Sequence, residues 1–260
     1  MNASDWPIST AETHRLTVER VIRAMRERIY QPLSLEDMAD VAHLSPYHFS
    51  RVFHNIIGVP PGEFLAALRL EEAKRLLLTT SLSVTDICFE LGYASLGSFT
   101  TRFTQLVGAP PRHLRHLAQD FTPPALESLH NSNTYSFCSV PVKGCFLGRV
   151  SVPGTFTGFV FVGLFPKPLP QGQPIRCTLL STAGRYFIKC VPDGRYYLLA
   201  VAFPLVEKHE EFLSPDAGLL LGMSQEPLLI HDGKMSGQAN LLLHPLCLTD
   251  PPIVFALPFL

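Results

Sequence analysis

Residues 34–53, SLEDMADVAHLSPYHFSRVF, decide the fold because they contain two helix starts with only ten residues between them. Ser34 and Asp37 have the spacing of a capping box, and Ser45-Pro46 offers an N-cap followed by proline at the first helical position. A short helix therefore has to turn sharply into a second helix through Ala42-His43-Leu44. This length predicts a helix-turn-helix unit.

The second of these helices has two different faces. The apolar stripe consists of Phe49, Val52, Phe53 and Ile56, and the opposite face carries Tyr47, Ser50, Arg51 and His54. A helix that lies in the major groove of DNA needs one side for the protein core and one side with hydrogen-bonding groups for bases and phosphates. An ordinary solvated helix has the same pattern, so this helix alone leaves both interpretations open.

A repeat favours the DNA-binding interpretation. Residues 33–39, LSLEDMA, recur 49 positions later as LSVTDIC in residues 82–88. After one inserted residue near Ala94 the offset becomes 50. It then pairs Phe49 with Phe99, Phe53 with Phe103, Gly58 with Gly108, and Pro60-Pro61 with Pro110-Pro111. Matching residues in one order indicate that the same supersecondary unit is used twice.

The segment between the two units predicts a linker helix over residues 61–78, because it carries apolar residues without an internal breaker. At about 1.5 Å per residue this helix is about 27 Å long. Successive major grooves on one face of B-DNA lie about 34 Å apart, so such a helix can hold two recognition helices near that separation. One chain is then expected to read a directional site whose two halves differ.

Residues 13–117 resemble the DNA-binding domain of the AraC/XylS family of bacterial transcription regulators. The resemblance rests on LSPYHFSRVF (44–53) and GVPP (58–61) in the first unit, and on DIC (86–88), LGY (91–93) and GAPP (108–111) in the second. It implies a helix-turn-helix at about 34–57 and another at about 83–107, with recognition helices in adjacent major grooves of double-stranded DNA. The predicted DNA-contacting residues are Tyr47, His48, Ser50, Arg51, His54, Gly97, Ser98, Thr100, Thr101, Arg102, Arg112 and Arg115.

The second unit departs from the family pattern. Thr101 stands where the first unit has Arg51, Gly97 stands opposite Tyr47, and Arg102 pairs with the apolar Val52. We therefore expect Arg51 to contact a guanine, and the second half-site to be read weakly through phosphates, hydroxyl groups and DNA shape. Arg112 and Arg115 are candidates for phosphate contacts, with a solvated helix end as the alternative.

Charge at first argues against a nucleic-acid binder, because the 260 residues include 21 Lys and Arg against 22 Asp and Glu. Residues 13–117, however, hold 12 basic side chains, 11 of them Arg, against 10 acidic ones, a net charge of +2. Affinity for DNA is accordingly expected to be moderate and sensitive to salt. With 47% hydrophobic residues, most of the chain is not intrinsically disordered.

The composition changes near Asp120. Residues 1–120 hold 7 of the 23 prolines and 5 of the 17 glycines, and the rest of the chain holds the others. We predict a multidomain α and β protein, with an N-terminal tail (1–12), an all-α, homeodomain-like tandem helix-turn-helix domain (13–117), a linker (118–137) and an all-β sandwich (138–260). Strands are expected at 159–165, 176–180, 185–191, 195–203, 227–231 and 239–244, and the tight turn at 191–195 predicts a hairpin.

The C-terminal domain resembles the prealbumin-like sandwich of carboxypeptidase regulatory-like domains, through GRYFIKCVPDGRYYLLA (184–200) and DGKMSGQANL (232–241). Such domains are usually non-catalytic, so the resemblance implies a sensory or oligomerising role. Tyr186, Tyr196 and Tyr197 are expected to fill the core rather than to line a ligand pocket. A homodimer through this domain is one expectation.

Little in the sequence predicts catalysis or a cofactor. His209-Glu210-Glu211 lacks the second His of a zinc helix, and G-x-S-x-G does not occur. The six cysteines favour buried free thiols over disulfides or a metal cluster. None has Pro before it and His-Arg after it, which disfavours a DNA alkyl-transfer enzyme fused to an AraC-type domain.

The expected protein is a cytoplasmic bacterial transcription regulator that is not an enzyme and has no metal, cofactor or membrane segment. RNA polymerase is an expected partner. The effector, the operator and the choice between activator and repressor stay open. The alternative is a sandwich module that binds a ligand or carbohydrate, with DNA contact secondary.

Overall fold

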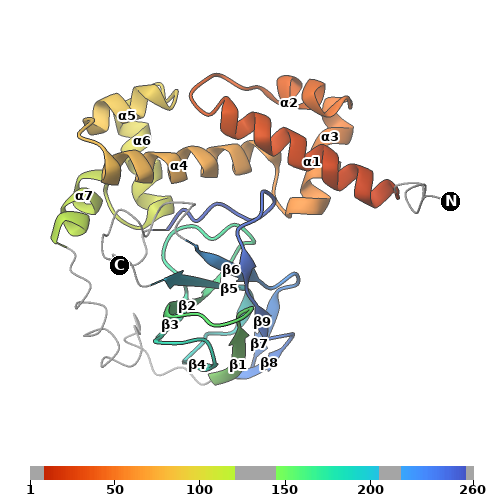
Figure 1. Ribbon diagram of the computed structural model, residues 1–260, viewed down its shortest axis with the longest axis vertical. Helices are drawn as coiled ribbons and strands as arrows, with labels where there is room; N and C mark the ends of the chain where they lie inside the picture. The colour runs from red at the N-terminus through yellow and green to blue at the C-terminus, as the bar shows by residue number, and fades with distance from the viewer. Residues whose placement is uncertain (1–8, 121–144, 205–217, 256–260) are drawn as a thin grey trace.

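The computed structural model describes residues 9–120, 145–204 and 218–255, which form a helical domain packed above a β domain (Figure 1). The helices are α1 (Thr10–Glu27), α2 (Leu35–Ala42), α3 (Pro46–Ile57), α4 (Pro61–Thr79), α5 (Val84–Glu90), α6 (Leu96–Val107) and α7 (Pro111–Asp120). None of the helices in these described ranges is long and apolar enough to cross a membrane.

Two capping boxes start the two helix-turn-helix units, as predicted. The Asp37 amide donates to Ser34 Oγ at 3.1 Å, and the Ser34 amide donates to Asp37 Oδ2 at 2.8 Å. Ser83 and Asp86 repeat this exchange before α5. The recognition helices α3 and α6 both end at glycines in the left-handed region, Gly58 at φ 85° and Gly108 at φ 95°, where a side chain would be strained.

Phenylalanines form the centre of the helical core. Phe49, Phe53, Phe99 and Phe103 are fully buried. The Phe53 ring contacts the Phe64 ring of α4 edge to face at 5.6 Å between centroids. Because α4 buries residues on most of its circumference, both units share one core through this helix.

The β domain is a sandwich of two sheets among the described residues. One sheet has the order β4 (Arg185–Lys189), β1 (Cys145–Ser151), β9 (Leu241–Leu242). The other sheet has the order β10 (His244–Pro245), β6 (Leu220–Met223), β5 (Gly194–Pro204), β2 (Gly158–Phe165), β3 (Arg176–Leu180). Two further strands extend it: β7 (Leu228–His231) pairs with β5, and β8 (Lys234–Ser236) pairs with β7. The all-β expectation is confirmed, whereas the carboxypeptidase regulatory-like relationship stays a prediction.

The predicted hairpin at residues 191–195 is wrong. Strand β4 pairs with β1 in one sheet, and β5 pairs with β2, β6 and β7 in the other, so the chain crosses between the sheets at this turn. The backbone before the turn is held in a different way: Cys190 has φ 55°, and its carbonyl accepts a hydrogen bond from Arg176 Nε at 3.0 Å. Pro and Gly show that the chain turns here, but they do not show which strand it pairs with.

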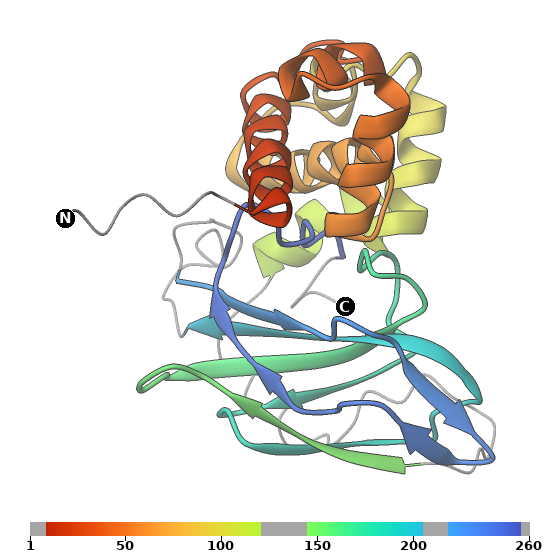
Figure 2. The ribbon, with the colours of Figure 1, turned by 90° about the vertical axis from the view of Figure 1, so that its right-hand side faces the viewer.

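Strand β2 is buried along its whole length, on both faces of its sheet. Val160, Val162 and Leu164 pack in the core between the two sheets. Phe159, Phe161 and Phe165 pack in a second core on the opposite face, together with Ile253 and Phe255 from the C-terminal segment. The sheet is therefore covered by its partner sheet on one side and by residues near the helical domain on the other (Figure 2).

The segment 250–255, called the strap below, ties the sandwich to α4. The Lys74 ammonium is buried and donates to the carbonyls of Ile253 and Phe255, the latter at 3.0 Å. The Ile253 amide donates to Glu71 Oε1 at 2.9 Å, and Val254 belongs to the helical core. These bonds join residues about 180 positions apart and fix one domain against the other.

The β2–β3 loop, residues 166–175, contacts both helix-turn-helix units. Lys167 forms an ion pair of 3.4 Å with Glu63 at the start of α4, just beyond the C-terminal end of α3. The Gly172 amide donates to the Leu106 carbonyl near the end of α6 at 2.6 Å. Leu169 of the same loop is buried in the helical core. Pro168 of the loop lies beside Gly58, the C-cap of α3, so the sandwich contacts the C-terminal ends of both recognition helices.

Candidate nucleic-acid interface

The two recognition helices lie on the same side of the helical domain. Figure 2 shows α3 (orange) and α6 (yellow) running roughly parallel, both to the right of α1 (red), and their lower ends approach the sandwich. Each is the second helix of its unit, and α4 connects the units. This is the arrangement that two adjacent major grooves require.

In the first unit the predicted base-reading residues are accessible on α3. Tyr47 is 80% exposed, Arg51 and His54 are exposed, and Ser50 is half-buried. Within the described residues the Arg51 guanidinium makes no hydrogen bond or ion pair. A planar, fully charged donor that is free of internal partners can bind both acceptors of a guanine edge.

His48 has a different environment from its predicted neighbours. It is half-buried, and its ring meets that of His14 on α1 edge to face, at 6.0 Å between centroids. Both rings line a groove between α1 and α3, together with Arg51 and Asn55. His48 therefore contacts α1, while Arg51 lies where the groove meets the exposed face of α3.

The second unit presents smaller polar groups on α6. Gly97, Ser98, Thr101 and Arg102 are exposed, and Thr100 is half-buried. The Ser98 hydroxyl donates to the Ser95 carbonyl at 2.9 Å and accepts from the Ser95 hydroxyl at 2.8 Å, so it is engaged in capping its own helix. Arg102 is exposed, although its repeat partner Val52 is only 5% exposed.

The structure separates the two arginines of α7. The Arg115 guanidinium donates from Nε to the Leu77 carbonyl at 2.9 Å and from Nη2 to the Leu82 carbonyl at 2.7 Å, which ties α7 to the end of α4. Arg112 is exposed and makes no hydrogen bond or ion pair within the described residues. Of the two, Arg112 is the one whose charge is available to a phosphate.

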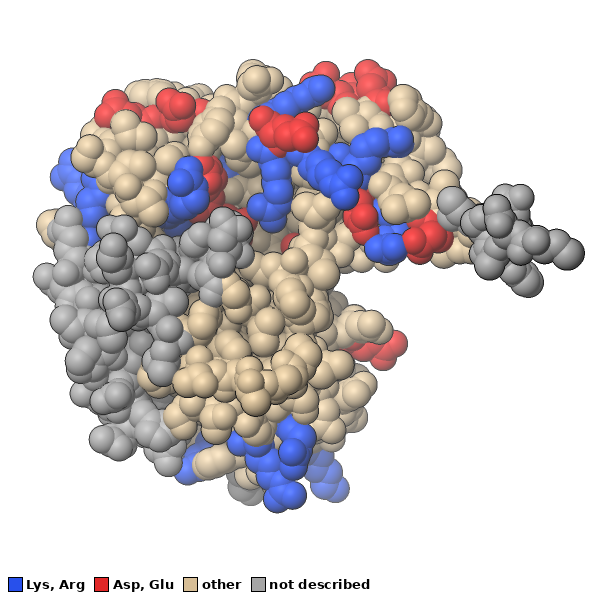
Figure 3. Space-filling model, viewed as in Figure 1, with Lys and Arg blue, Asp and Glu red and all other residues tan. Residues whose placement is uncertain are grey.

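Three other arginines of the helical domain, Arg15, Arg26 and Arg75, pair with neighbouring carboxylates. Arg15 pairs with Glu12 and Glu19, each at 2.6 Å, and Arg26 pairs with Glu71 at 3.6 Å. Figure 3 shows Lys and Arg interleaved with Asp and Glu over this face of the helical domain. The modest excess of positive charge is thus not gathered on the visible face. Among the described residues of the helical domain, the exposed arginines without a hydrogen bond or ion pair are Arg51 on α3, Arg102 on α6 and Arg112 on α7, together with Arg23 on α1 and Arg28 just after it.

The predicted core tyrosines are confirmed for two of three positions. Tyr186 and Tyr196 are buried, and Tyr197 is half-buried. The Tyr186 hydroxyl donates to the Ala239 carbonyl at 2.6 Å, and burial raises the pKa of this phenol. The hydroxyl passes so close to Gly148 that a Cβ there would lie 2.4 Å from it, which explains the glycine.

The cysteines only partly follow the expectation of burial. Cys88 and Cys177 are buried, and burial raises the pKa of the Cys177 thiol to about 11. The expectation is wrong for Cys145 and Cys247, which are exposed; Cys138 lies outside the described residues. Cys247 stands beside His244 and Asp250, a cluster that the sequence reasoning missed because its H-x2-C-x2-D spacing matches no common metal motif.

Comparison with known proteins identifies the helical domain. Residues 38–116 match the family model described as "Helix-turn-helix domain". The HTH-type transcriptional activator AarP of Providencia stuartii is 32% identical over 109 residues, which cover 40% of this chain and 81% of AarP. YobQ of Bacillus subtilis, an uncharacterized HTH-type transcriptional regulator, is 35% identical over 95 residues, 36% of this chain and 39% of YobQ.

A further relative combines two activities. AdaA of Bacillus subtilis, a bifunctional transcriptional activator and DNA repair enzyme, is 29% identical over 116 residues, 45% of this chain and 52% of AdaA. The chain thus spans between two fifths and about half of the length of these two Bacillus subtilis relatives. All three similarities concern proteins described as transcription regulators or activators.

Proposed function

Since the chain belongs to the AraC type of helix-turn-helix transcription regulators, we propose that it binds a directional double-stranded DNA site with α3 and α6 in successive major grooves. The α3 helix reads bases through Arg51, with Tyr47, Ser50 and His54 beside it. The α6 helix contributes contacts from Thr101, Thr100, Gly97 and Ser98 and a phosphate contact from Arg102. Arg112 adds a second phosphate contact from α7.

The observation that carries this proposal is the contrast among the arginines. Arg51 is exposed and unpaired within the described residues, whereas Arg15, Arg26 and Arg115 are engaged in bonds inside the protein. A guanidinium without partners inside the protein breaks no internal hydrogen bond when it binds a base or a phosphate. His48 contacts His14, so we place it at the edge of the interface. From the groove between α1 and α3 its side chain can reach the DNA backbone.

We assign the chain no reaction of its own. A DNA alkyl-transfer activity needs a thiol with a lowered pKa, and burial raises the pKa of both Cys88 and Cys177. The pKa of Cys247 is also raised, by partial burial and by the negative charges of Asp250 and Glu19. Cys88, Cys177 and Cys247 therefore lack the activation that the reaction requires.

The remaining roles follow from the proposed DNA binding. The protein acts in the bacterial cytoplasm, where it meets the chromosome and RNA polymerase. The sandwich senses an effector and offers a surface for a homodimer. Two of its contacts with the helical domain, the strap and the β2–β3 loop, are the routes by which a change in the sandwich reaches the recognition helices.

The test is a gel shift of the full chain on fragments of the genome that encodes it, at physiological salt. We expect a small set of fragments to be retained in the presence of excess unrelated DNA, and Arg51→Ala to lose that selectivity while keeping weak binding to all fragments. If the unaltered full chain retains no fragment above the level of unrelated DNA, the proposed function fails.

A further inference from the structure

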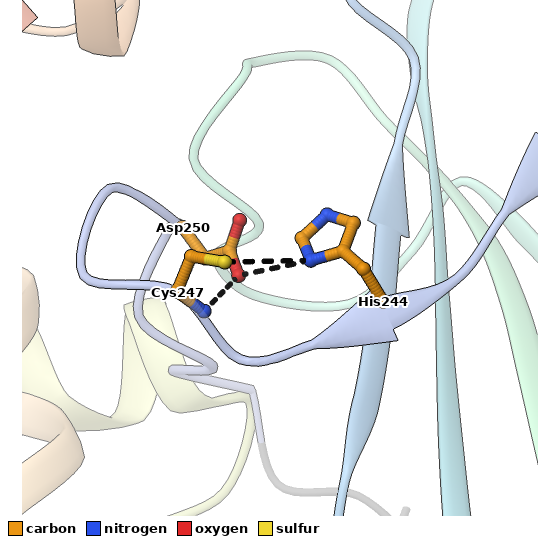
Figure 4. Close-up of side chains that lie close together, drawn as sticks. All are labelled: His244, Cys247 and Asp250. Carbon is orange, nitrogen blue, oxygen red and sulfur yellow. Dashed lines mark hydrogen bonds and ion pairs between the residues drawn. The ribbon is translucent and has the colours of Figure 1, made fainter. Parts of the chain in front are cut away.

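Three side chains with metal-ligand chemistry meet where the sandwich joins the strap. His244 lies on β10, and Cys247 and Asp250 lie on the loop that follows (Figure 4). Cys247 Sγ is 3.8 Å from His244 Nδ1, and His244 Nδ1 is 3.7 Å from Asp250 Oδ2. The three ligand atoms all lie within 4.8 Å of one another.

The distances of 3.8 Å and 3.7 Å from His244 Nδ1 to Cys247 Sγ and to Asp250 Oδ2 match those in a metal site. Ligand atoms held at about 2.0–2.3 Å from a tetrahedral zinc ion lie about 3.3–3.8 Å apart. A thiolate, an imidazole and a carboxylate together suit zinc and related late transition metals rather than magnesium or calcium, which prefer oxygen ligands alone. Three protein ligands leave a fourth position for water.

The loop already holds this arrangement without an ion. The Cys247 amide donates to Asp250 Oδ2 at 2.7 Å, which orients the carboxylate. His244 Nδ1 and Cys247 Sγ both approach the Pro245 carbonyl, at 2.9 and 3.4 Å, so each can place its proton there. On metal binding the thiol loses its proton to solvent and the imidazole proton moves from Nδ1 to Nε2, which leaves both atoms free to bind the ion.

The site is accessible from one side. Cys247 is exposed, the His244 side chain is 46% exposed and the Asp250 side chain is 14% exposed. An ion can therefore enter from solvent, while the carboxylate stays fixed by its surroundings. The buried thiols Cys88 and Cys177 are different, because among the described residues neither belongs to a cluster of His, Cys, Asp or Glu side chains that could bind one ion.

A second cluster in the sandwich offers an internal comparison. Asp193, His231 and Asp232 also lie within metal-ligand distance, but all three are exposed and none is a thiol. Both Asp193 carboxylate oxygens already accept backbone hydrogen bonds, from Asp232 at 2.9 Å and from Gly233 at 3.4 Å. These bonds brace the β7–β8 turn, so this cluster is explained without an ion.

We propose that His244, Cys247 and Asp250 bind one zinc-class transition-metal ion, and that its occupancy steadies the strap on α4. Asp250 begins the strap, and only two residues separate it from Ile253, whose amide and carbonyl are held by Glu71 and Lys74. Fixing Asp250 on an ion restricts the chain just before these bonds. Because α4 sets the separation of α3 and α6, steadying the strap on α4 favours the arrangement in which both helices contact their grooves. This effect of the ion on DNA binding rests on the proposed function.

Cobalt titration of the full chain tests the site without reference to DNA. After treatment with a chelator, the protein is expected to bind one Co²⁺ with the ultraviolet charge-transfer band of a cobalt–thiolate bond. Cys247→Ser should abolish the band, and Asp250→Asn should weaken binding at least about tenfold. The exposed-cysteine control Cys145→Ser and the second-cluster control His231→Gln should leave both unchanged. A wild-type titration without the band, or a band that survives in Cys247→Ser, would overturn the site.

DNA binding measured with and without Zn²⁺ tests the coupling. On a retained DNA fragment, Zn²⁺ should tighten binding of the unaltered chain at least about fivefold, a chelator should reverse this, and Cys247→Ser should show no change. Equal affinity with and without Zn²⁺ in a chain that shows the cobalt–thiolate band would overturn the coupling. If the chain binds no fragment under either condition, the proposed function fails, and the cobalt spectrum still decides the metal site.

Discussion

The first and second helix-turn-helix units have the same scaffold and different exposed faces. Both start with a capping box, both bury two phenylalanines on the recognition helix, and both end that helix at a glycine with positive φ. On the exposed side, however, Tyr47 and Arg51 of α3 correspond to Gly97 and Thr101 of α6. The residues that pack the core and cap the helices are the same type in both units because the fold requires them. The exposed residues are not needed for the fold, so they differ between the units and can contact different DNA sequences.

The largest expected effect tests whether the two scaffolds are energetically equivalent. Phe53→Ala and Phe103→Ala should each lower the free energy of unfolding by about 3–5 kcal/mol, because both rings are fully buried and their removal leaves a cavity. Urea denaturation of the full chain measures the loss. A cost below about 1 kcal/mol at one of the two sites would show that the units do not share one core.

A pH-dependent effect tests how the strap holds α4 between the units. Burial lowers the pKa of Lys74 to about 8, so the folded chain loses this proton at lower pH than the unfolded chain does. Burying the charged Lys74 ammonium lowers the free energy of unfolding, and this cost is fully present below pH 8. The cost disappears as pH rises from 8 toward about 10.5, the pKa of Lys74 in the unfolded chain. Wild type should therefore gain on the order of 3 kcal/mol relative to Lys74→Met between pH 7 and pH 10.5.

The measurement is the difference in unfolding free energy between wild type and Lys74→Met at several pH values. Other titrating groups are common to both proteins and cancel in this difference. The carbonyls of Ile253 and Phe255 lose their donor in the variant at every pH, which adds a constant offset. A difference that does not change with pH would contradict the burial of a charged Lys74 on the strap.

A smaller effect compares the exposed faces of the two units directly. Arg51→Ala should weaken binding to the selected DNA by about 1–3 kcal/mol, and Thr101→Ala by less than about 1 kcal/mol, because a hydroxyl replaces a bidentate guanidinium in the second unit. Fluorescence anisotropy at fixed salt measures both, with Arg15→Ala as a control for an arginine engaged in ion pairs. Equal losses at the two sites would remove the asymmetry.

The smallest effect concerns the turns inside the units. His43 in the first turn has φ 56°, and Gly92 at the equivalent place in the second has φ 77°. His43→Gly should stabilise the protein by about 0.5–1 kcal/mol because glycine adopts this region without strain, and Gly92→Ala should destabilise it by about the same amount. Thermal unfolding measures both. Destabilisation by His43→Gly would mean that the imidazole makes a contact worth more than the relieved strain.

Local signals in the sequence predict most of the helical domain. The capping residues, the apolar stripes and the repeat place the helices because each depends on residues within a few positions of one another. The same reasoning fails at residues 191–195, where Pro and Gly predict a turn but contain no information on which sheet the next strand joins. Pairing between strands depends on packing over the whole sandwich.

Long-range contacts explain the rest of what the sequence did not reveal. Arg115 is the type of residue that contacts phosphates. In the structure, however, it donates to the carbonyls of Leu77 and Leu82, at and just beyond the end of α4 and more than 30 residues away. Lys74 lies in a helix that looks solvated at that position until residues 253–255 cover it. His244, Cys247 and Asp250 are close in sequence, but only the fold of their loop brings the three ligand atoms to one point.

Selection of binding sites from random double-stranded DNA by the full chain tests the central claim most directly. We predict a directional site in which one half, assigned to α3 by its loss in Arg51→Ala, shows strong base preference that includes a guanine, and the other half, about one helical turn away, shows weak preference. A palindromic site, or a stronger preference in the half that survives Arg51→Ala, would contradict the account.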